Sequence, residues 1–328
     1  MPLSLLQLLR HHREHWLTMD ALQSVLRQSP ERILSKIEQL RNMGHRVESA
    51  PALGFRLIGQ VAVLTADLIE YGLSTERVGR KILVYEVTDS TNDVAWAHAG
   101  DPETDGLVVF AEYQRLGRGR LRRRWSAPPS TSLLVSVLLR EHSTEVGRAL
   151  TLLAGLATAQ AVEEVTGVPP RIKWPNDITV SGRKLAGIMV ESRKIDRGFG
   201  YVIGIGINCQ QTSEQFAAEV RHSAISLRQL LKKEVDRLQL AQRLLVVLEQ
   251  WLLVLRENHV DRLHQEWLSR CDDVGHRLNL IQNGRTYHGR VIDVSPDQGL
   301  WLQLDEGAVK AFDPATTTVQ RADDVPGG

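Results

Sequence analysis

The sequence predicts an α+β protein built in three parts. In the first sixty residues, apolar side chains recur at helical spacing and are followed by two short strands. From Lys81 onward, strand-like segments lie close together with few helices between them, and after Cys271 only short strands and polar turns remain. These changes of pattern place the three parts at residues 1–65, 66–271 and 272–328.

The composition is that of an ordinary globular protein, with 42% hydrophobic and 24% charged residues. Its 40 Lys and Arg against 39 Asp and Glu give a formal net charge of +1 over 328 residues. This balance excludes a protein coated with nucleic acid over its whole surface, but it is compatible with a local basic patch. Because Cys209 and Cys271 form no Cys-x-x-Cys pair, we expect neither a disulfide scaffold nor a metal site, and we expect a cytoplasmic protein.

Two apolar segments could be mistaken for export or membrane signals. The N-terminal run has no small-residue cleavage site and predicts a helix over residues 3–16. The most apolar segment, residues 238–255, contains Arg243 and Glu249 near its middle, which predicts a buried amphipathic helix. We therefore expect no membrane partner.

The rest of the N-terminal part predicts two helices and a strand pair. Thr18 stands before the first helix, whereas Ser29 and Pro30 are the cap and first-turn residues of the second, which Gly44 ends. The second helix carries its apolar residues on one stripe: Ile33, Ile37, Leu40 and Met43. Two short helices followed by a strand pair around residues 51–54 are typical of a winged helix-turn-helix.

The charge of this part favours DNA binding without requiring it. Eight Arg and Lys against five acidic residues give residues 1–60 a formal charge of +3. The candidate DNA contacts on the exposed face of the second helix are Ser29, Arg32 and Lys36. Glu31 would repel phosphate at the start of that helix. A helical dimerisation or docking module is the alternative.

The central part predicts a mixed sheet, and the last part predicts a small β-barrel. A linking helix and turn are predicted over residues 66–80, a longer helix over 148–166 and further helices over 223–269. The predicted central strands are KILVYEV, GLVVFAEY, SLLVSVLLR, RIKW, ITV, KLAGIMVES and YVIGIGIN. The predicted barrel strands are RLNLIQ, RTYHGRVIDV, LWLQL, AVKAF and TTTVQR.

The most unusual window is Gln114–Trp125, which contains no acidic residue. Its arginines are Arg115, Arg118, Arg120, Arg122, Arg123 and Arg124. Gly117 and Gly119 allow a tight turn whose amide N–H groups can form an anion-binding nest, and guanidinium groups match phosphate oxygens. We interpret the window as a mobile phosphate lid; a solvated basic loop or a localisation signal is the alternative.

A second cluster follows the predicted strand RIKW. The turn at Lys173-Trp-Pro-Asn-Asp177 should bring Lys173, Asp177 and Lys184 to one end of the sheet. A lysine among residues as apolar as LAGIMV is costly unless it meets an anion. A lysine that snorkels from a strand edge is the alternative.

A third cluster, Asp89-Ser-Thr-Asn92, supplies small hydrogen-bonding groups after the first central strand, although helix capping alone would account for it. Several familiar motifs are absent, including a P-loop, His-Glu-x-x-His and Gly-x-Ser-x-Gly. The run from Gly204 to Cys209 begins like a dinucleotide fingerprint but has Cys209 in place of the third glycine. Phosphate chemistry in this chain must therefore use a different arrangement.

Taken together, these motifs resemble the biotin–protein ligase family, specifically its bifunctional ligase/repressor branch. The matching motifs occur in the family's order: DSTN at 89–92, AEYQ at 111–114, GRGR at 117–120 with Trp125, KWPND at 173–177, KLAG at 184–187 and GIGIN at 204–208. With the N-terminal helices and the C-terminal barrel, the resemblance covers nearly the whole chain.

The resemblance implies a fold and a reaction. The implied fold is a winged helix-turn-helix, a central sheet with helices like that of class II synthetases, and a small SH3-like β-barrel. The implied reaction joins biotin to ATP, with Mg²⁺, to give biotinyl-5′-AMP, and then transfers biotin to a lysine of a biotin carrier protein domain. Operator DNA is an implied partner, and a homodimer is one oligomeric state compatible with the sequence.

The resemblance also assigns residues to roles. It implies catalytic roles for Lys184, Arg120, Asp177 and Lys173. The residues that it implies contact biotin are Ser90, Thr91, Asn92, Gln114, Arg118, Gly119, Arg120 and Lys184. The residues that it implies contact ATP are Arg118, Arg120, Trp125, Asn176, Lys184 and Asn208. Lys184 would bridge the carboxylate of biotin and the α-phosphate.

The chain departs from the family at one position of the loop. Where the family commonly has a glycine, this chain has Arg122, which should stiffen the loop.

Two alternative functions remain open. One is a ligand-sensing repressor that makes its corepressor as its main role, and the other is a lipoate-type ligase, which KWPND and the arginine-rich loop disfavour.

Overall fold

Seven strands form the central sheet, in the order β3-β4-β5-β9-β8-β7-β6. The computed structural model describes residues 4–60, 63–141, 144–196, 198–295, 298–314 and 316–320. The strands are β3 Ile82–Thr88, β4 Val108–Gln114, β5 Ser132–Glu141, β6 Arg171–Lys173, β7 Asp177–Val180, β8 Arg183–Ile195 and β9 Gly198–Asn208. Strands β3 and β4 pair in parallel, whereas the other neighbours in this sheet pair antiparallel. The predicted mixed α+β architecture is therefore confirmed.

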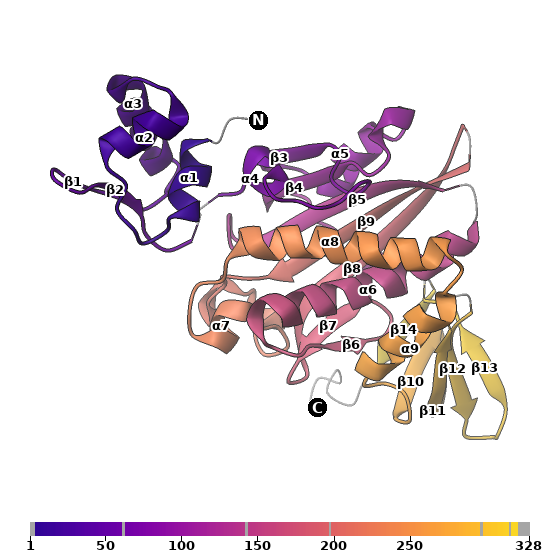
Figure 1. Cartoon of the computed structure of the whole chain (residues 1–328). Helices are drawn as coiled ribbons and strands as arrows, with labels where there is room; N and C mark the ends of the chain where they lie inside the picture. Colours follow the sequence, from indigo (N-terminus) through magenta and orange to yellow (C-terminus); the bar gives the residue numbers. More distant parts are fainter. Residues whose placement is uncertain are drawn as a thin grey trace.

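The two faces of this sheet are covered by different helices. Alternate residues of β9 point to opposite faces: Ile203 and Ile205 join the main core, which includes the apolar residues of α6 Thr144–Thr166. Val202 joins a smaller core with Ala95 and Trp96 of the short helix α5 Thr91–Ala97. Helix α8 Arg237–Arg256 packs across α6, and α9 Val260–Arg270 follows it (Figure 1).

Helix α8 is long and apolar enough to cross a membrane by length and composition, but 61% of its apolar window is buried within the fold. Its charged residues are used internally: Arg243 pairs with Glu164 of α6. Glu249 accepts hydrogen bonds from the backbone N–H groups of residues 76, 77 and 78, at 2.6 to 2.8 Å. The prediction of a buried helix over 238–255 agrees with this arrangement.

The same glutamate holds the turn that follows the predicted linking helix. Helix α4 covers Ala66–Glu70 and the chain from residue 71 to 81 runs through turns, in agreement with the helix and turn predicted over 66–80. Because Glu249 fixes three consecutive N–H groups of this segment, those donors are not available for an i→i−4 helical ladder. The helices predicted over 223–269 are three, since α7 Leu227–Leu231 precedes α8 and α9.

The N-terminal part contains α1 Leu5–His11, α2 Met19–Leu26, α3 Pro30–Asn42, β1 Val47–Ala50 and β2 Gly54–Leu57. Helix α1 ends before the predicted residue 16 because the chain turns at Glu14, at φ 67°, and Leu17 then bridges to Phe55. Thr18 caps α2 as expected, accepting from the N–H of Ala21 at 3.2 Å. Ser29 occupies the N-cap of α3 and Pro30 its first turn, as predicted, although the Ser29 side chain makes no capping hydrogen bond.

Polar contacts join this part to the central sheet region. Gln7 donates to the carbonyl of Asp67 at 2.8 Å, and Arg46 pairs with Glu234 at 3.0 Å. Arg10 and Arg13 both approach Asp236 at the start of α8, at 3.7 and 3.5 Å. In Figure 1 the N-terminal helices accordingly lie beside α4 and the β3 edge, away from the C-terminal sheet.

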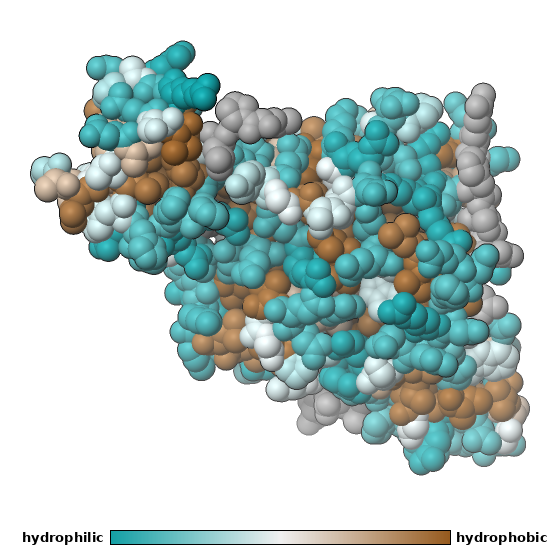
Figure 2. Space-filling model, viewed as in Figure 1, coloured by the Kyte–Doolittle hydropathy of each residue, from teal (hydrophilic) through white to brown (hydrophobic). Residues whose placement is uncertain are grey.

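The C-terminal residues form a five-stranded antiparallel sheet in the order β13-β12-β11-β10-β14. Its strands are β10 Arg277–Gln282, β11 Arg285–Ser295, β12 Gly299–Leu304, β13 Val309–Phe312 and β14 Thr317–Gln320. These match the predicted strands to within a residue or two at each end. Figure 2 shows an apolar patch on the visible surface over this sheet, whereas hydrophilic side chains cover much of the remaining face.

A buried ion pair lies where the linker from the N-terminal part meets the central sheet. Glu112 of β4 accepts from Arg237 at 2.7 Å and from the N–H of Leu64 at 2.6 Å. The side chains of Glu112 and Arg237 are only 5% and 3% exposed. The pair therefore anchors the linker and the start of α8 to the strand that leads into the arginine-rich loop.

Replacing Glu112 by leucine is expected to destabilise the protein by about 3–5 kcal/mol, because Arg237 would be left as an uncompensated buried charge. Urea unfolding followed by circular dichroism measures this loss. Arg171→Ala is the matched control: its pair with Asp272 is about half exposed, so its removal should cost less than about 1 kcal/mol. Equal losses in the two variants would contradict the anchoring role of Glu112.

Candidate active site

A small polar cluster forms where β3 runs into α5. The backbone N–H and hydroxyl of Thr91 both donate to Oε1 of Gln114, at 2.7 and 2.9 Å. The hydroxyl of Ser136 lies 2.7 Å from Thr91 Oγ1 and 2.6 Å from Asn92 Oδ1. Ser90, Thr91 and Asn92 are all buried, and Ser90 makes no capping hydrogen bond. The cluster is therefore more than a helix cap, which was the alternative explanation of the DSTN motif.

Glycines on β8 and β9 make room for this cluster and for Trp125. A Cβ atom at Gly204 would lie 2.5 Å from Asn92 Oδ1, and one at Gly206 would lie 2.6 Å from the Trp125 ring. At Gly187 a Cβ would approach both Trp125 and Lys184 to 3.2 Å. We call these three glycines the glycine floor. The GIGIN and KLAG motifs thus provide space beneath Asn92, Trp125 and Lys184.

The arginine-rich loop folds over the glycine floor as a tight turn. Trp125 N–H donates to the carbonyl of Gly117 at 2.9 Å, and Gly119 N–H donates to that of Arg123 at 2.8 Å. These two amides are consequently engaged within the loop and are not available to an anion in this conformation. Leu121, at φ 54°, takes the left-handed conformation that favours glycine, next to the position where the family commonly has one.

Arg118 is held by carboxylates on the α5 side. Its guanidinium binds Asp93 through two hydrogen bonds of 2.6 Å and lies 3.6 Å from Glu191. The hydrogen bonds from Arg118 hold the pKa of Asp93 below its ordinary value. Glu191 in turn accepts from Trp96 at 2.5 Å. In this conformation Arg118 therefore positions the loop and does not present a free cation.

Arg120 reaches the opposite way, towards the C-terminal sheet. Its guanidinium donates to Asn176 Oδ1 at 3.1 Å, to the carbonyl of Thr317 at 3.1 Å and to that of Pro314. Burial lowers the pKa of Arg120, and the charges of Asp177 and Asp313 oppose that shift. A half-buried guanidinium held mainly by neutral oxygens retains an attraction for an anion such as a phosphate.

Lys173, Asp177 and Lys184 come together as expected. Lys173 and Asp177 are directly opposite each other in the β6–β7 pair, and Lys184 Nζ lies 2.6 Å from Asp177 Oδ1. The register of β7 with β8 shifts at Thr179, so that Thr179 faces Lys184 and Leu185 is the extra residue of a β-bulge. The Lys184 ammonium also lies 5.7 Å from the centre of the Trp125 ring.

The two asparagines predicted to contact ATP differ in their surroundings. Asn176 binds Arg120 through Oδ1 and the carbonyl of Ile188 through Nδ2, which fixes the turn to β8. Asn208 is buried; its Nδ2 donates to the carbonyls of Lys184 and Ile225, and its Oδ1 accepts from Gln211. The Asn208 side chain therefore holds backbone segments together here and presents no free group.

Two residues of the site were missed at the sequence level. Ser136 is the polar residue within the apolar strand SLLVSVLLR, a signal that could have been used. Glu191 lies beyond the KLAG motif, and only the sheet register brings it to Arg118. The described residues hold no group of three or more His, Cys, Asp or Glu side chains suited to a metal ion.

Burial raises the pKa of Cys209 and of Cys271 to about 12, so neither thiol provides a thiolate at neutral pH.

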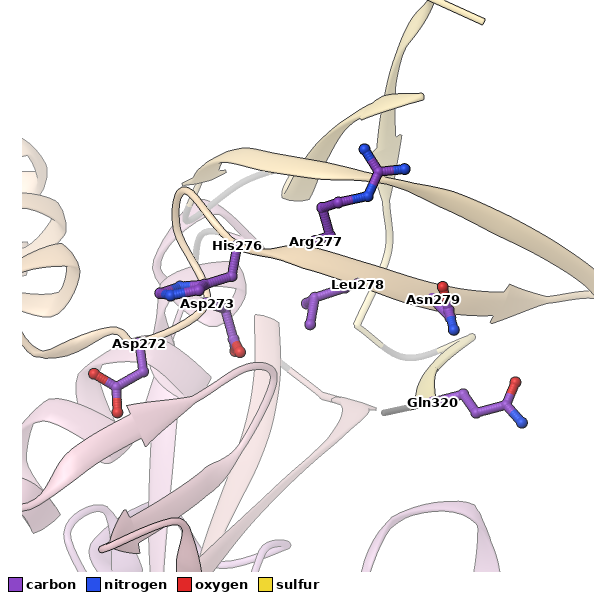
Figure 3. Close-up of a pocket in the computed structure, with 7 residues that line it drawn as sticks. All are labelled: Asp272, Asp273, His276, Arg277, Leu278, Asn279 and Gln320. Atoms are coloured by element: carbon purple, nitrogen blue, oxygen red, sulfur yellow. The ribbon is translucent and has the colours of Figure 1, made fainter. Parts of the chain in front are cut away.

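A cavity of about 460 Å³ lies at the start of the C-terminal sheet, and neither Lys184 nor the arginine-rich loop is part of its described lining. Figure 3 shows His276 with the carboxylates of Asp272 and Asp273 at one end of it, and Asn279 with Gln320 at the other.

Comparison with known proteins identifies the family. Residues 84–208, which include the DSTN cluster, the loop, the lysines and the glycine floor, match the Biotin/lipoate A/B protein ligase family. Bifunctional ligase/repressor BirA of Bacillus subtilis is 32% identical over 278 residues, which covers 84% of this chain and 86% of the relative. The chain belongs to the biotin/lipoate protein ligase family.

Other members of the ligase family match this chain as well. Bifunctional ligase/repressor BirA of Escherichia coli is 30% identical over 315 residues, covering 95% of this chain and 94% of the relative. The biotin protein ligase of Aquifex aeolicus, solved with biotin and ATP, superposes with a TM-score of 0.63 at 24% identity, over 74% of this chain and all of that one. The latter shows that this chain has the ligase fold.

Proposed function

We propose that the protein is an ATP-dependent biotin–protein ligase. The observation that supports this most strongly is the convergence of Lys184 and the loop tryptophan on the glycine floor, beside the Thr91–Asn92–Gln114–Ser136 cluster. Asp177, the ion-pair partner of Lys184, also acts through its charge on Arg120, which is bound to the neighbouring Asn176. The relatives add weight, because the similar ligase of Mycobacterium tuberculosis, 35% identical over 256 residues, is named biotin–[acetyl-CoA-carboxylase] ligase.

In the proposed first step, a carboxylate oxygen of biotin attacks the α-phosphorus of ATP and pyrophosphate leaves. The polar cluster would bind the ureido ring of biotin, because it offers both hydrogen-bond donors and acceptors in a buried position. Lys184 would bridge the carboxylate and the α-phosphate, and the Arg120 guanidinium would stabilise charge that develops on phosphorus. Lys173 and Asp177 would position Lys184, and Arg118 and Gly119 would close the loop over biotin.

In the proposed second step, the amine of a lysine on a biotin carrier protein domain attacks the acyl carbon, and AMP leaves as the amine loses a proton. The mixed anhydride must be shielded from water until the carrier arrives, and the loop with Trp125 is placed to cover it. Mg²⁺ is proposed to enter with ATP, since it is usually held by one or two carboxylates and substrate phosphates. Asp177 is the carboxylate nearest Lys184.

Transfer of labelled biotin to a purified carrier domain tests this proposal. Label should appear on the carrier lysine only when ATP is present, and lipoate should not compete. Preferential transfer of lipoate would replace the proposal by a lipoate-type ligase. Absence of transfer by a folded protein that is supplied with ATP, Mg²⁺ and a carrier would contradict both.

A second role as a biotin-responsive repressor is proposed for the N-terminal part, which we interpret as a winged helix-turn-helix. Arg32 and Ser29 are exposed on α3 and Lys36 is half-buried, which suits contact with a DNA backbone. The bifunctional ligase/repressor relatives cover this part of the chain as well. The same proposal includes a C-terminal sheet of the SH3-like kind and a central part like that of class II synthetases, with the three parts bounded at residues 1–65, 66–271 and 272–328. It also includes a homodimeric state and a cytoplasmic location.

Selection from a random duplex library with biotin and ATP present should enrich a recurring sequence that the protein retards in a gel. The variant Arg32→Ala/Lys36→Ala should weaken this binding at least tenfold and flatten its salt dependence, because two phosphate contacts are lost. Lys233→Ala, at an exposed position near α8, is the control. No enrichment with or without biotin and ATP would eliminate the repressor role and leave the ligase proposal unaffected.

A further inference from the structure

The arginine-rich loop is attached to α5, the short helix that carries the polar cluster. Asp93 belongs to the first turn of α5 and directly follows Asn92. The Arg118 guanidinium donates one hydrogen bond to each carboxylate oxygen of Asp93, both at 2.6 Å. Such a forked pair fixes the direction of the guanidinium as well as its distance. The loop is therefore held by the same helix whose first residues form the candidate substrate cluster.

The close packing of α5 on the sheet makes Asp93 a fixed anchor. A Cβ atom at Gly200 of β9 would lie 3.2 Å from the Trp96 ring, and one at Gly204 would lie 2.5 Å from Asn92 Oδ1. Glycine at these positions lets the helix approach the strand closely. Asn92 and Trp96 are buried, whereas Asp93 is exposed. Asp93 consequently projects towards the loop from a helix that is held in place.

A second carboxylate extends the pair into a network. Glu191 of β8 lies 3.6 Å from Arg118 and accepts from the indole N–H of Trp96 at 2.5 Å. The guanidinium of Arg193 lies 4.2 Å from the centre of the Trp96 ring, and its charge also acts on Asp93. Isolated surface ion pairs contribute little, but forked geometry and a network of charges are the conditions under which such pairs matter. The contact of Arg118 with α5 meets both conditions.

The loop is attached differently on its two sides. Arg120 donates to the amide oxygen of Asn176 and to two main-chain carbonyls, whereas Arg118 donates to a carboxylate. The side chains of Arg118 and Asp93 are 37% and 48% exposed, so dissolved salt screens the attraction between them. Hydrogen bonds to uncharged oxygens depend less on salt. The attachment at α5 is therefore the salt-sensitive one.

We propose that Asp93 is a positioning residue of the ligase reaction, which holds Arg118 and thereby keeps the loop, with Trp125, seated on the glycine floor. Asp93 acts through Arg118 and does not itself touch the substrates. Its part in the reaction rests on the proposed function, because a seated loop is what would shield the adenylate from water. The seating of the loop is a property of the ligand-free protein and can be measured without any substrate.

The position of Trp125 reports this seating, because its ring lies against the glycine floor. Full-length protein is labelled with 5-fluorotryptophan, and the ¹⁹F signal of Trp125 is identified by its loss in Trp125→Phe. In Asp93→Asn we expect this signal to move towards its position in the urea-unfolded protein. Asp93→Glu keeps the charge, so its signal should stay close to that of the unmodified protein. The control is Asp196→Asn, which removes an exposed carboxylate in the turn after β8 and should have no effect.

Salt provides a second test that needs no variant to fold. Raising NaCl from about 0.05 to about 0.5 M should move the Trp125 signal of the unmodified protein in the same direction as Asp93→Asn does. In Asp93→Asn the salt response should be much smaller, because the carboxylate whose attraction salt screens is gone. An unmoved Trp125 signal in Asp93→Asn, or equal salt responses in the two proteins, would overturn the proposal.

Release of biotinyl-5′-AMP measures the consequence for the reaction. Asp93→Asn should release it about three- to tenfold faster than the unmodified protein, because one charge-assisted attachment of the loop is lost. The double variant Asp93→Asn/Arg118→Gln should release it no faster than Arg118→Gln alone, since Asp93 acts through Arg118. Additive effects of the two substitutions would contradict this route. If the unmodified protein formed no adenylate, the proposed function would fail, whereas the Trp125 signal would still decide whether Asp93 seats the loop.

Discussion

Replacing Lys184 by glutamine is expected to lower kcat/KM for adenylate formation by about 100- to 1,000-fold. Glutamine keeps a polar side chain of similar length but removes the charge that would lie between the attacking carboxylate and the α-phosphate. Loss of a single preorganised electrostatic group in an active site typically costs a factor of this size. Asp177, 2.6 Å from Lys184 in the structure, would then also face the substrate phosphates without its partner.

Pyrophosphate release from biotin and ATP, measured in the absence of a carrier, isolates this step. Lys194→Gln is the matched control, because Lys194 lies on the same strand but is exposed and far from the bulge that aims Lys184. A normal burst of pyrophosphate from Lys184→Gln would contradict the catalytic role. A loss of the same size in Lys194→Gln would show that the strand is disturbed in general.

Arg120→Ala is expected to release or hydrolyse the adenylate at least tenfold faster than the unmodified protein. The guanidinium joins the loop to Asn176 and to two backbone carbonyls of the C-terminal sheet. Without it the loop loses its connection on that side, and water reaches the anhydride. The same charge is expected at the α-phosphate, so adenylate formation should also slow.

The lifetime of biotinyl-5′-AMP on the protein, followed after gel filtration, measures retention directly. Arg123→Ala provides the control within the same loop, because that side chain is exposed. Arg120→Lys keeps the charge but not the fork of donors, so its lifetime should fall between those of the other two. If Arg120→Ala retains the adenylate as long as Arg123→Ala, the closing role is wrong.

Much of the fold could be predicted because the pattern of apolar residues determines it. The C-terminal strands and the apolar stripe of α3 follow from local periodicity. The strands occur where expected, and Ile33 and Ile37 of the stripe are buried, whereas Met43 lies beyond the end of α3 and is exposed. The helix and turn predicted over 66–80 are both present, but the place where the helix gives way to the turn was not predictable, because Glu249, far along the chain, accepts from the N–H groups at residues 76–78. No local signal reports such a distant acceptor.

The candidate site was likewise predictable from the sequence only in part. The meeting of Lys184 with Asp177 was predictable, since a short turn between antiparallel strands sets the pairing. The orientation of the arginines was not: Arg118 turns to Asp93 and Arg120 to the C-terminal sheet, although two positions separate them. The purpose of Gly204 and Gly206 was also hidden, because a glycine that makes room leaves no chemical signature of its own.

The link between Arg120 and the C-terminal sheet ends on the main-chain oxygens of Pro314 and Thr317. Every amino acid carries such an oxygen, so substitutions at those two positions that preserve the backbone path leave the acceptors in place. Among related sequences, the residue types at these two positions should therefore not covary with the residue type at position 120, even though Arg120 donates hydrogen bonds to both residues. A deletion, an insertion or a change of backbone path between β13 and β14 would remove these hydrogen bonds. Related sequences should therefore vary in the side chains of this connection but not in its length.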